Sequence, residues 1–161
     1  MMAKVIANMG SLMRKLDSLG GNVQKALTRG MRITLQSAQG SANRRKPYGS
    51  IRIQEEMKAT ADKVEGKVFS NTPWAAYVEF GTGPVGAADH DGISPNVAVT
   101  YHPTSWAWPT GEKDANGKEI FVTTRGQPAK PYLYPASKEN ESVFEGETRK
   151  AVLEEIRRMG G

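Results

Sequence analysis

A chain of 161 residues, of which 38% are hydrophobic, is long enough for one core of ordinary size and too short for two. The absence of cysteine excludes disulfides, thiolate catalysis and cysteine-ligated zinc, and it fits synthesis in a reducing cytoplasm. The net charge of +5 is uneven: residues 1–46 carry nine Lys or Arg against one acid, and the rest carries 13 bases against 16 acids. An anionic partner is therefore expected at the N-terminal segment.

No apolar run in the sequence approaches the length of a membrane span. The N-terminus also lacks the compact apolar block and the small-residue cleavage site of a signal peptide. We therefore expect a protein that is made and used without export and that has no membrane partner.

A long amphipathic helix is predicted within residues 1–40. At 100° per residue, apolar side chains stay on one side of it and basic side chains gather on the other. The apolar set is Val5, Met9, Leu12, Leu16, Val23, Leu27, Met31 and Leu35; the basic set is Lys4, Arg14, Lys15, Lys25, Arg29 and Arg32. Such a face is most often simply solvated, but the absence of acids makes this one a candidate contact for DNA or for an acidic protein.

Residues 40–49 are expected to end this helix and form a loop. Arg44, Arg45 and Lys46 form a short basic cluster there. The cluster is either a solvated loop or a second set of phosphate contacts, and it joins Lys25, Arg29 and Arg32 as a candidate lining of a DNA channel.

A β-hairpin is predicted over residues 52–60 and 64–71, with its turn near Asp62 and Lys63. Val64 and Val68 alternate with Glu65 and Lys67, which is the period-2 pattern of a half-buried strand.

A short buried helix is predicted over residues 73–83, with Thr72 as its N-cap, Pro73 at its first position and Gly81 as its stop. We expect this helix to anchor the sheet and the loop that follows. The candidate core or subunit anchors are Trp74, Tyr77, Glu79, Phe80, Gly81 and Gly83.

Residues 84–131 are rich in Gly, Pro, Asp and Asn, and are predicted to be an extended insertion with strand-like islands at 96–101 and 119–124. We expect Trp106 and Trp108 on opposite faces of an extended strand, one in the core and one at a contact surface. Together with Tyr132 and Tyr134 they are the candidates for contacts between subunits.

A last helix is predicted over residues 136–159, after a proline-stiffened lead-in at 126–135. Its apolar face is expected to hold Phe144, Ala151, Val152, Ile156 and Met159. The complete prediction is a single α+β domain over residues 1–161. In this prediction, long N- and C-terminal helices pack on a small antiparallel sheet. Residues 51–83 form the hairpin and the short helix, and residues 84–131 form the loop insertion.

Groups able to perform catalysis are few. Asp89, His90 and Asp91, with His102 further on, could bind a divalent ion, although a polar loop is the preferred interpretation. Gly81, Thr82 and Gly83 lack the lysine and hydroxyl residue of a phosphate-binding loop. No nucleophile elbow is present. We expect no enzyme, no cofactor and no metal site.

Two motifs in this order resemble the tail-component proteins of long-tailed bacteriophages that act at the head–tail joint. The first reads Tyr77-Val78-Glu79-Phe80-Gly81-Thr82-Gly83, and the second reads Pro131-Tyr132-Leu133-Tyr134-Pro135-Ala136. The resemblance covers most of the chain between Val5 and Met159. The chain departs from the family pattern in lacking an Asp-Thr-Gly-x-Leu segment before the hairpin, in having Tyr132 for the usual Phe, and in its longer insertion.

The resemblance implies a structural protein of the virion neck, made in the host cytoplasm. It would form a homo-oligomeric, hexameric ring between the head connector or stopper proteins and the tail tube or terminator proteins, with double-stranded DNA passing through the bore. The alternatives are a tail terminator that caps the tube and a small basic DNA-binding protein.

Overall fold

The computed structural model describes residues 2–8, 23–60 and 63–159 of the chain. Its internal contacts divide the chain into two compact units. Unit 1 consists of Met1–Thr72 and Tyr132–Gly161, and unit 2 consists of Pro73–Pro131. The predicted α+β class is confirmed, because helices combine with two small antiparallel sheets.

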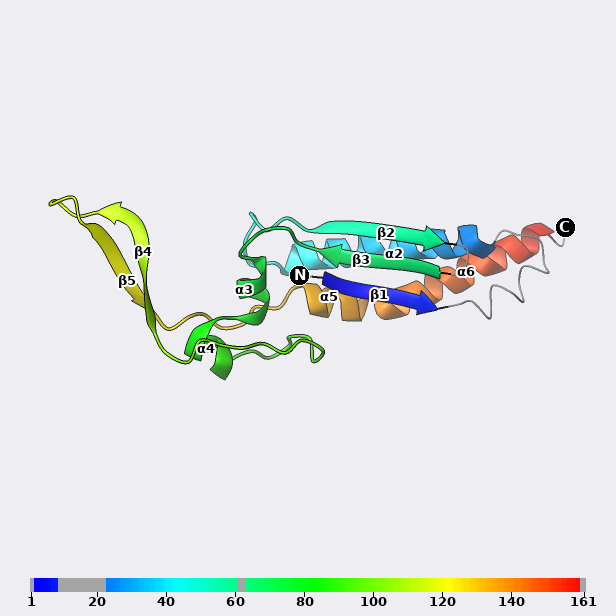
Figure 1. Cartoon of the computed structure of the whole chain (residues 1–161). Helices are drawn as coiled ribbons and strands as arrows, with labels where there is room; N and C mark the ends of the chain where they lie inside the picture. Colours follow the sequence, from blue (N-terminus) through cyan, green and yellow to red (C-terminus); the bar gives the residue numbers. More distant parts are fainter. Residues whose placement is uncertain (1, 9–22, 61–62, 160–161) are drawn as a thin grey trace. The chain divides into compact units, whose positions relative to one another are not determined.

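The sheet of unit 1 has three strands in the order β1-β3-β2 (Figure 1). Strands β2 (Gln54–Thr60) and β3 (Lys63–Phe69) pair antiparallel, which confirms the predicted hairpin. Strand β1 (Met2–Asn8) pairs antiparallel with the other side of β3. The helix expected from the start of the chain is therefore wrong for these residues. Pairing with β1 occupies the second row of β3 backbone hydrogen-bonding groups, and this tertiary contact outweighs a helical periodicity. The rest of the predicted stretch up to residue 22 lies outside the described residues.

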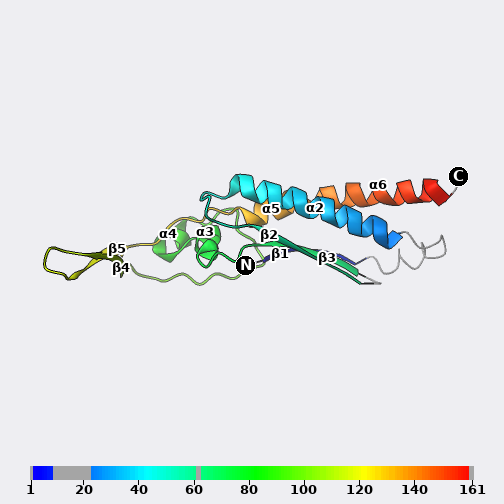
Figure 2. The ribbon, with the colours of Figure 1, turned by 90° about the horizontal axis from the view of Figure 1, so that it is seen from above.

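Three helices cover one face of this sheet, as the view from above shows (Figure 2). They are α2 (Val23–Arg45), α5 (Leu133–Glu139) and α6 (Glu141–Met159). The last predicted helix is thus two helices that meet at Asn140, whose side-chain amide donates to the carbonyl of Ala136 at 2.8 Å. The predicted end of the first helix near Gly40 is wrong, because α2 continues to Arg45.

The core of unit 1 lies between helices and sheet. Leu27, Met31 and Leu35 are at most 2% exposed, which confirms this part of the predicted apolar face of α2. Val64 and Val68 of β3 face them across Gly66, where an added Cβ would lie 2.6 Å from the sulfur of Met31. Glycine at this position lets α2 approach the sheet closely. On α6, Phe144 and Ala151 are buried as predicted, whereas Ile156 is exposed.

The opposite face of the sheet is polar. Lys67 forms an ion pair with Glu56 at 2.7 Å across β2 and β3, and its ammonium group lies 5.2 Å from the ring centroid of Phe69. Lys63 pairs with Glu65 on the same face at 2.7 Å. This alternation of buried apolar and outer charged side chains is typical of an antiparallel sheet with one solvated face.

Unit 2 contains two short helices and a second hairpin. Helix α3 (Ala75–Phe80) corresponds to the predicted central helix, although Trp74 and not Thr72 precedes its first residue. Helix α4 (Gly83–Ala88) follows at once and has Pro84 in its first turn, which suits a helix start. Strands β4 (Trp106–Lys113) and β5 (Glu119–Thr124) form a two-stranded antiparallel sheet. The island at 119–124 is confirmed as β5, whereas residues 96–101 form no strand.

Candidate interaction site

A backbone clamp joins two distant segments of unit 2, at Thr82 and at Gln127. The amide of Thr82 donates to the carbonyl of Gln127 at 2.9 Å, and the amide of Gln127 donates to the carbonyl of Thr82 at 3.1 Å. The side-chain amide of Gln127 also donates to the carbonyl of Tyr77 at 2.9 Å. Gly126, with φ +90°, makes this approach possible, because a Cβ there would lie 1.9 Å from the Thr82 oxygen. We call these contacts of Gly126 and Gln127 with Thr82 and Tyr77 the clamp.

An aromatic groove of about 770 Å³ lies beside the clamp. Tyr77 and Phe80 of α3 form one wall, Tyr101 and His102 of the following segment form another, and Trp106 and Trp108 of β4 form the third. None of the groove residues that the structure describes is Asp, Glu, Lys or Arg. A concave surface lined mainly by aromatic side chains suits an apolar or aromatic occupant.

Tyr101 fixes the segment that forms the second wall. Its hydroxyl donates to the carbonyl of Phe80 at 2.8 Å, and its ring lies 5.7 Å from the ring of His90. Burial raises the pKa of Tyr101 above its ordinary value of 10.0, because desolvation disfavours the phenolate. His102 contacts Trp106 edge-on, with ring centroids 5.5 Å apart.

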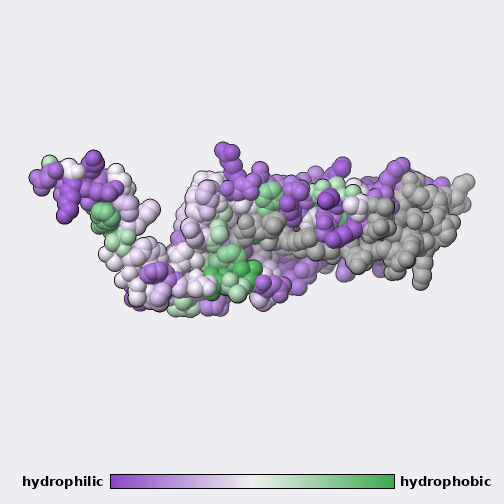
Figure 3. Space-filling model, in the orientation of Figure 1, coloured by the Kyte–Doolittle hydropathy of each residue, from purple (hydrophilic) through white to green (hydrophobic). Residues whose placement is uncertain are grey.

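The β4–β5 hairpin presents apolar side chains on both of its faces. Trp108 pairs with Val122 on one face, and Pro109 pairs with Phe121 on the other. Trp108 and Phe121 are each 57% exposed, and Val122 is 43% exposed. In the space-filling view, a hydrophobic band crosses the hairpin behind its hydrophilic tip (Figure 3). The prediction that Trp106 and Trp108 point to opposite faces is wrong, since residues two apart on a strand share a face, and both line the groove.

The tip of this hairpin is a tight turn around Asp114. One carboxylate oxygen of Asp114 accepts hydrogen bonds from the amides of Asn116 at 2.8 Å and Lys118 at 2.9 Å. Gly117 has φ +79°, a conformation that glycine adopts without strain. The hairpin is thus well formed, yet among the described residues β4 and β5 have no further strand on either outer edge.

The predicted anchors of the central helix separate into buried and exposed groups. Glu79 is 1% exposed, Gly81 and Gly83 are buried, and Trp74 and Phe80 are half-buried. Tyr77 is 60% exposed and is therefore a surface residue of the groove instead of a core anchor.

The two tyrosines of the second motif belong to unit 1. Tyr132 is fully buried in the chain and is not accessible to another subunit, which corrects its assignment as a contact residue. It directly precedes the first residue of α5, where a buried aromatic side chain serves packing. Tyr134 is half-buried in α5.

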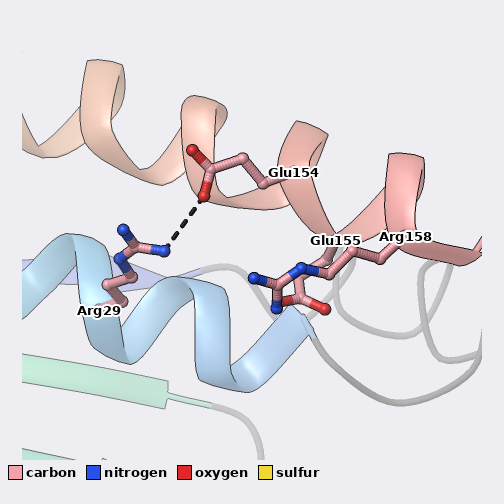
Figure 4. A network of polar contacts seen from close by, with 4 residues as sticks. All are labelled: Arg29, Glu154, Glu155 and Arg158. Carbon is pink, nitrogen blue, oxygen red and sulfur yellow. Dashed lines mark hydrogen bonds and ion pairs between the residues drawn. The ribbon is translucent and has the colours of Figure 1, made fainter.

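The predicted basic residues of α2 form a shallow groove on unit 1. Lys25, Arg29 and Arg32 line it together with Gln24, Thr28 and Ile33, and its volume is about 460 Å³. Arg29 is partly neutralised by an ion pair with Glu154 of α6 at 3.1 Å (Figure 4). The basic surface of unit 1 is thus less uniform than the helix alone predicts.

The second basic cluster does not join the first. Arg45 forms an ion pair with Glu139, and the ammonium group of Lys46 donates to the carbonyl of Ile51 at 2.6 Å. Arg44 is exposed in the last turn of α2. Two of the three residues therefore hold the end of α2 in place, which makes a mobile phosphate-binding loop a poor description of them.

One ring nitrogen of each histidine lies within hydrogen-bonding distance of a backbone carbonyl. The Nδ1 atom of His90 lies 3.1 Å from the carbonyl of Gly86, and that of His102 lies 2.8 Å from the carbonyl of Thr104. Across the described ranges, no three His, Asp or Glu side chains gather as metal ligands would. In the same ranges no helix has the length and the apolar content needed to cross a membrane.

Comparisons of the chain with protein-family models, with curated proteins and with solved structures found no match.

Proposed function

We propose that this chain is a structural subunit of a bacteriophage neck, forming a tail-completion or head–tail joining ring around the DNA channel. The order of its two motifs, Tyr77–Gly83 and Pro131–Ala136, supports this family assignment. A tail terminator ring is the nearest alternative and would use the same kind of contact between subunits.

The observation that carries the proposal is the exposed β4–β5 hairpin. An isolated two-stranded hairpin is marginally stable in water, and it normally needs a third strand or a packed face. Trp108, Phe121 and Val122 leave apolar surface uncovered within one copy. Large exposed aromatic groups on a projecting element favour a subunit that completes its burial on assembly.

The first experiment measures the mass of the purified chain in solution by light scattering over a concentration series. A closed ring is expected, and the double variant Trp108→Ser with Phe121→Ser is expected to shift it to the monomer. The matched control is Leu153→Ser on α6, which removes an exposed apolar side chain outside the hairpin and should leave the mass unchanged. A wild-type chain that stays monomeric at every concentration contradicts self-assembly of the ring.

The second experiment concerns the place of the protein in a particle. Labelled antibodies against the chain should bind tailed particles at the junction of head and tail in electron micrographs. Label on the distal tail or on no particle would overturn the assignment to the neck, whatever the mass in solution.

A small DNA-binding protein is the second candidate, because Lys25 and Arg32 are exposed on one face of α2 and Arg44 is exposed at its end. This candidate predicts that the monomer itself binds duplex DNA and that its affinity falls steeply with salt.

A further inference from the structure

The unit 2 insertion carries two complementary surfaces, one concave and one projecting. The concave surface is the aromatic groove between α3, Tyr101 and β4. The projecting surface is the face of the β4–β5 hairpin that holds Pro109, Phe121 and Thr123. From this pairing we infer that the hairpin of one copy inserts Phe121 into the aromatic groove of a second copy. The inference rests on the proposed ring and names its subunit contact.

A chain cannot fill its own groove with its own hairpin. Trp106, Trp108 and Thr124, at the base of the hairpin, are themselves part of the groove wall. The register places Trp108 with Val122 on this wall face and Phe121 with Pro109 on the opposite face. Phe121 therefore points away from the groove of its own copy, and only another molecule can bring the two surfaces together.

The chemistry of both surfaces favours a second copy over DNA. The groove has no Lys or Arg among its described residues, so it lacks the side chains that mainly neutralise a phosphate backbone. The hairpin tip carries three acids and two bases, namely Glu112, Asp114, Glu119, Lys113 and Lys118. This nearly balanced charge gives no attraction to DNA and little repulsion of an identical subunit. Aromatic anchors that enter aromatic-lined grooves are the usual centre of a protein–protein contact.

The two faces of one hairpin would then have different roles. The Trp106 and Trp108 face builds the receiving groove, while the Phe121 face enters the groove of the next copy. Because the surfaces are different, the contact is head-to-tail and it closes into a ring when the rotation per subunit permits. A two-fold symmetric dimer would instead bring the same hairpin face of two copies together.

The absence of natural cysteine makes this geometry directly testable by thiol cross-linking. Two single variants are prepared, Phe121→Cys on the hairpin and Tyr77→Cys in the groove, then mixed in equal amounts and oxidised with copper–phenanthroline. Contact raises the local thiol concentration to the millimolar range, so the mixed cross-link should form about tenfold or more faster than either variant cross-links with itself. The matched control replaces Phe121→Cys with Arg149→Cys, an exposed position on α6 of unit 1, and should show no such preference.

The first cysteine pair removes two aromatic side chains of the proposed contact, so a second pair is needed that keeps them. Thr123→Cys lies on the same hairpin face as Phe121, and Thr100→Cys lines the groove, and both positions are exposed. These changes keep every aromatic side chain, and the same preference for the mixed product is expected. The double variant Thr100→Cys with Thr123→Cys should form a covalent ladder that ends at the ring.

Three outcomes overturn the inference. The first is a predominant cross-link of the Phe121→Cys variant with itself. The second is an oligomer in which neither cysteine pair prefers the mixed product. The third is a monomer that gives no mixed product at any concentration. The second of these leaves the proposed neck ring standing with another subunit contact. Conversely, a mixed cross-link in a protein that antibodies do not find at the neck supports this contact and rejects the neck.

Discussion

The backbone of Gly30 lies directly against the side chain of Thr148. A Cβ at position 30 would be 2.6 Å from Thr148 Oγ1 and 3.0 Å from its backbone nitrogen. Gly30 belongs to α2 and Thr148 to α6, so this contact sets how closely the two long helices of unit 1 approach. The carbonyl of Gly30 also accepts a hydrogen bond from the hydroxyl of Thr34 at 2.9 Å.

The variant Gly30→Ala is therefore expected to destabilise unit 1, although alanine is the better helix former. Overpacking of a close helix contact costs about 1–3 kcal/mol, which exceeds the gain in helix propensity. The matched control is Gly146→Ala in α6, where nothing lies within 4 Å of the added Cβ. That control should stabilise the protein by about 0.5–1 kcal/mol. Chemical denaturation measures both, and changes of the same sign would show that the contact does not limit the packing.

The clamp of unit 2 gives a second prediction about glycine. Gly126→Ala should open the contact between residues 82 and 127, because its Cβ would overlap the Thr82 carbonyl at 1.9 Å. Gly111→Ala is the control, since it has a similar φ of +81° against +90° but open space around its Cβ. Both variants suffer backbone strain of about 1–3 kcal/mol, and only the first should expose the amides of Thr82 and Gln127 to hydrogen exchange. Equal exchange in the two variants would contradict the clamp.

Tyr101 predicts a dependence of unit 2 on alkaline pH. Burial raises its pKa above 10.0, so the folded chain keeps the phenol neutral where the unfolded chain ionises it. Its contribution to stability is fully present below pH 10.0 and is lost as the pH rises through the raised pKa. Tyr101→Phe should cost about 1 kcal/mol at neutral pH, through the lost hydrogen bond to Phe80, and should flatten the decline above pH 10.0.

The measurement is thermal unfolding across alkaline pH, followed with the ultraviolet absorbance of the phenolate. Tyr48→Phe, at an exposed position of unit 1, is the control and should leave the Tyr101-dependent decline in place. An unchanged alkaline decline in Tyr101→Phe would assign it to other groups.

The basic groove of unit 1 separates the two proposed functions. If the monomer binds duplex DNA, Lys25→Glu with Arg32→Glu should lower its affinity more than tenfold and reduce the salt slope by about 2, as expected for two lost phosphate contacts. Arg29 is left unchanged because Glu154 already pairs with it. The control, Lys113→Glu with Lys118→Glu, changes the net charge equally at the hairpin tip. Equal losses in the two variants would indicate a general charge effect instead of a site on α2.

The spacing of apolar residues in the sequence predicted strand β3 and the buried face of α2. The alternation of Val64 and Val68 indicated β3, and the spacing of Leu27, Met31 and Leu35 indicated the buried face of α2. Strand β1 was not predicted, because its conformation depends on pairing with β3 and not on its own periodicity. The extension of α2 past Gly40 depends on burial of Ser41 and Ala42 and on a hydrogen bond from Ser41 to Glu139 at 3.0 Å, which are tertiary contacts.

The candidate site was only half visible in the sequence. The motif with Tyr77 and Phe80 stood out by composition, but its partners in the groove come from residues 99–108, which form no continuous periodic segment. Alternation along β4 was available as a signal, since Trp106 and Trp108 share a face in any strand. The burial of Tyr132 depends on tertiary packing, which no local pattern indicates.

The paired hydrogen bonds between Thr82 and Gln127 hold the start and the end of the segment 82–127 side by side. The exposed turn between β4 and β5 can therefore change in length without shifting residues 82 and 127, at an entropic cost that grows only slowly with length. A short affinity peptide inserted at Asn116 and Gly117, in the exposed turn, should be displayed with no change in the thermal stability of unit 1. The hairpin can in this way change its length or its binding partner while the helices and the sheet of unit 1 stay unchanged.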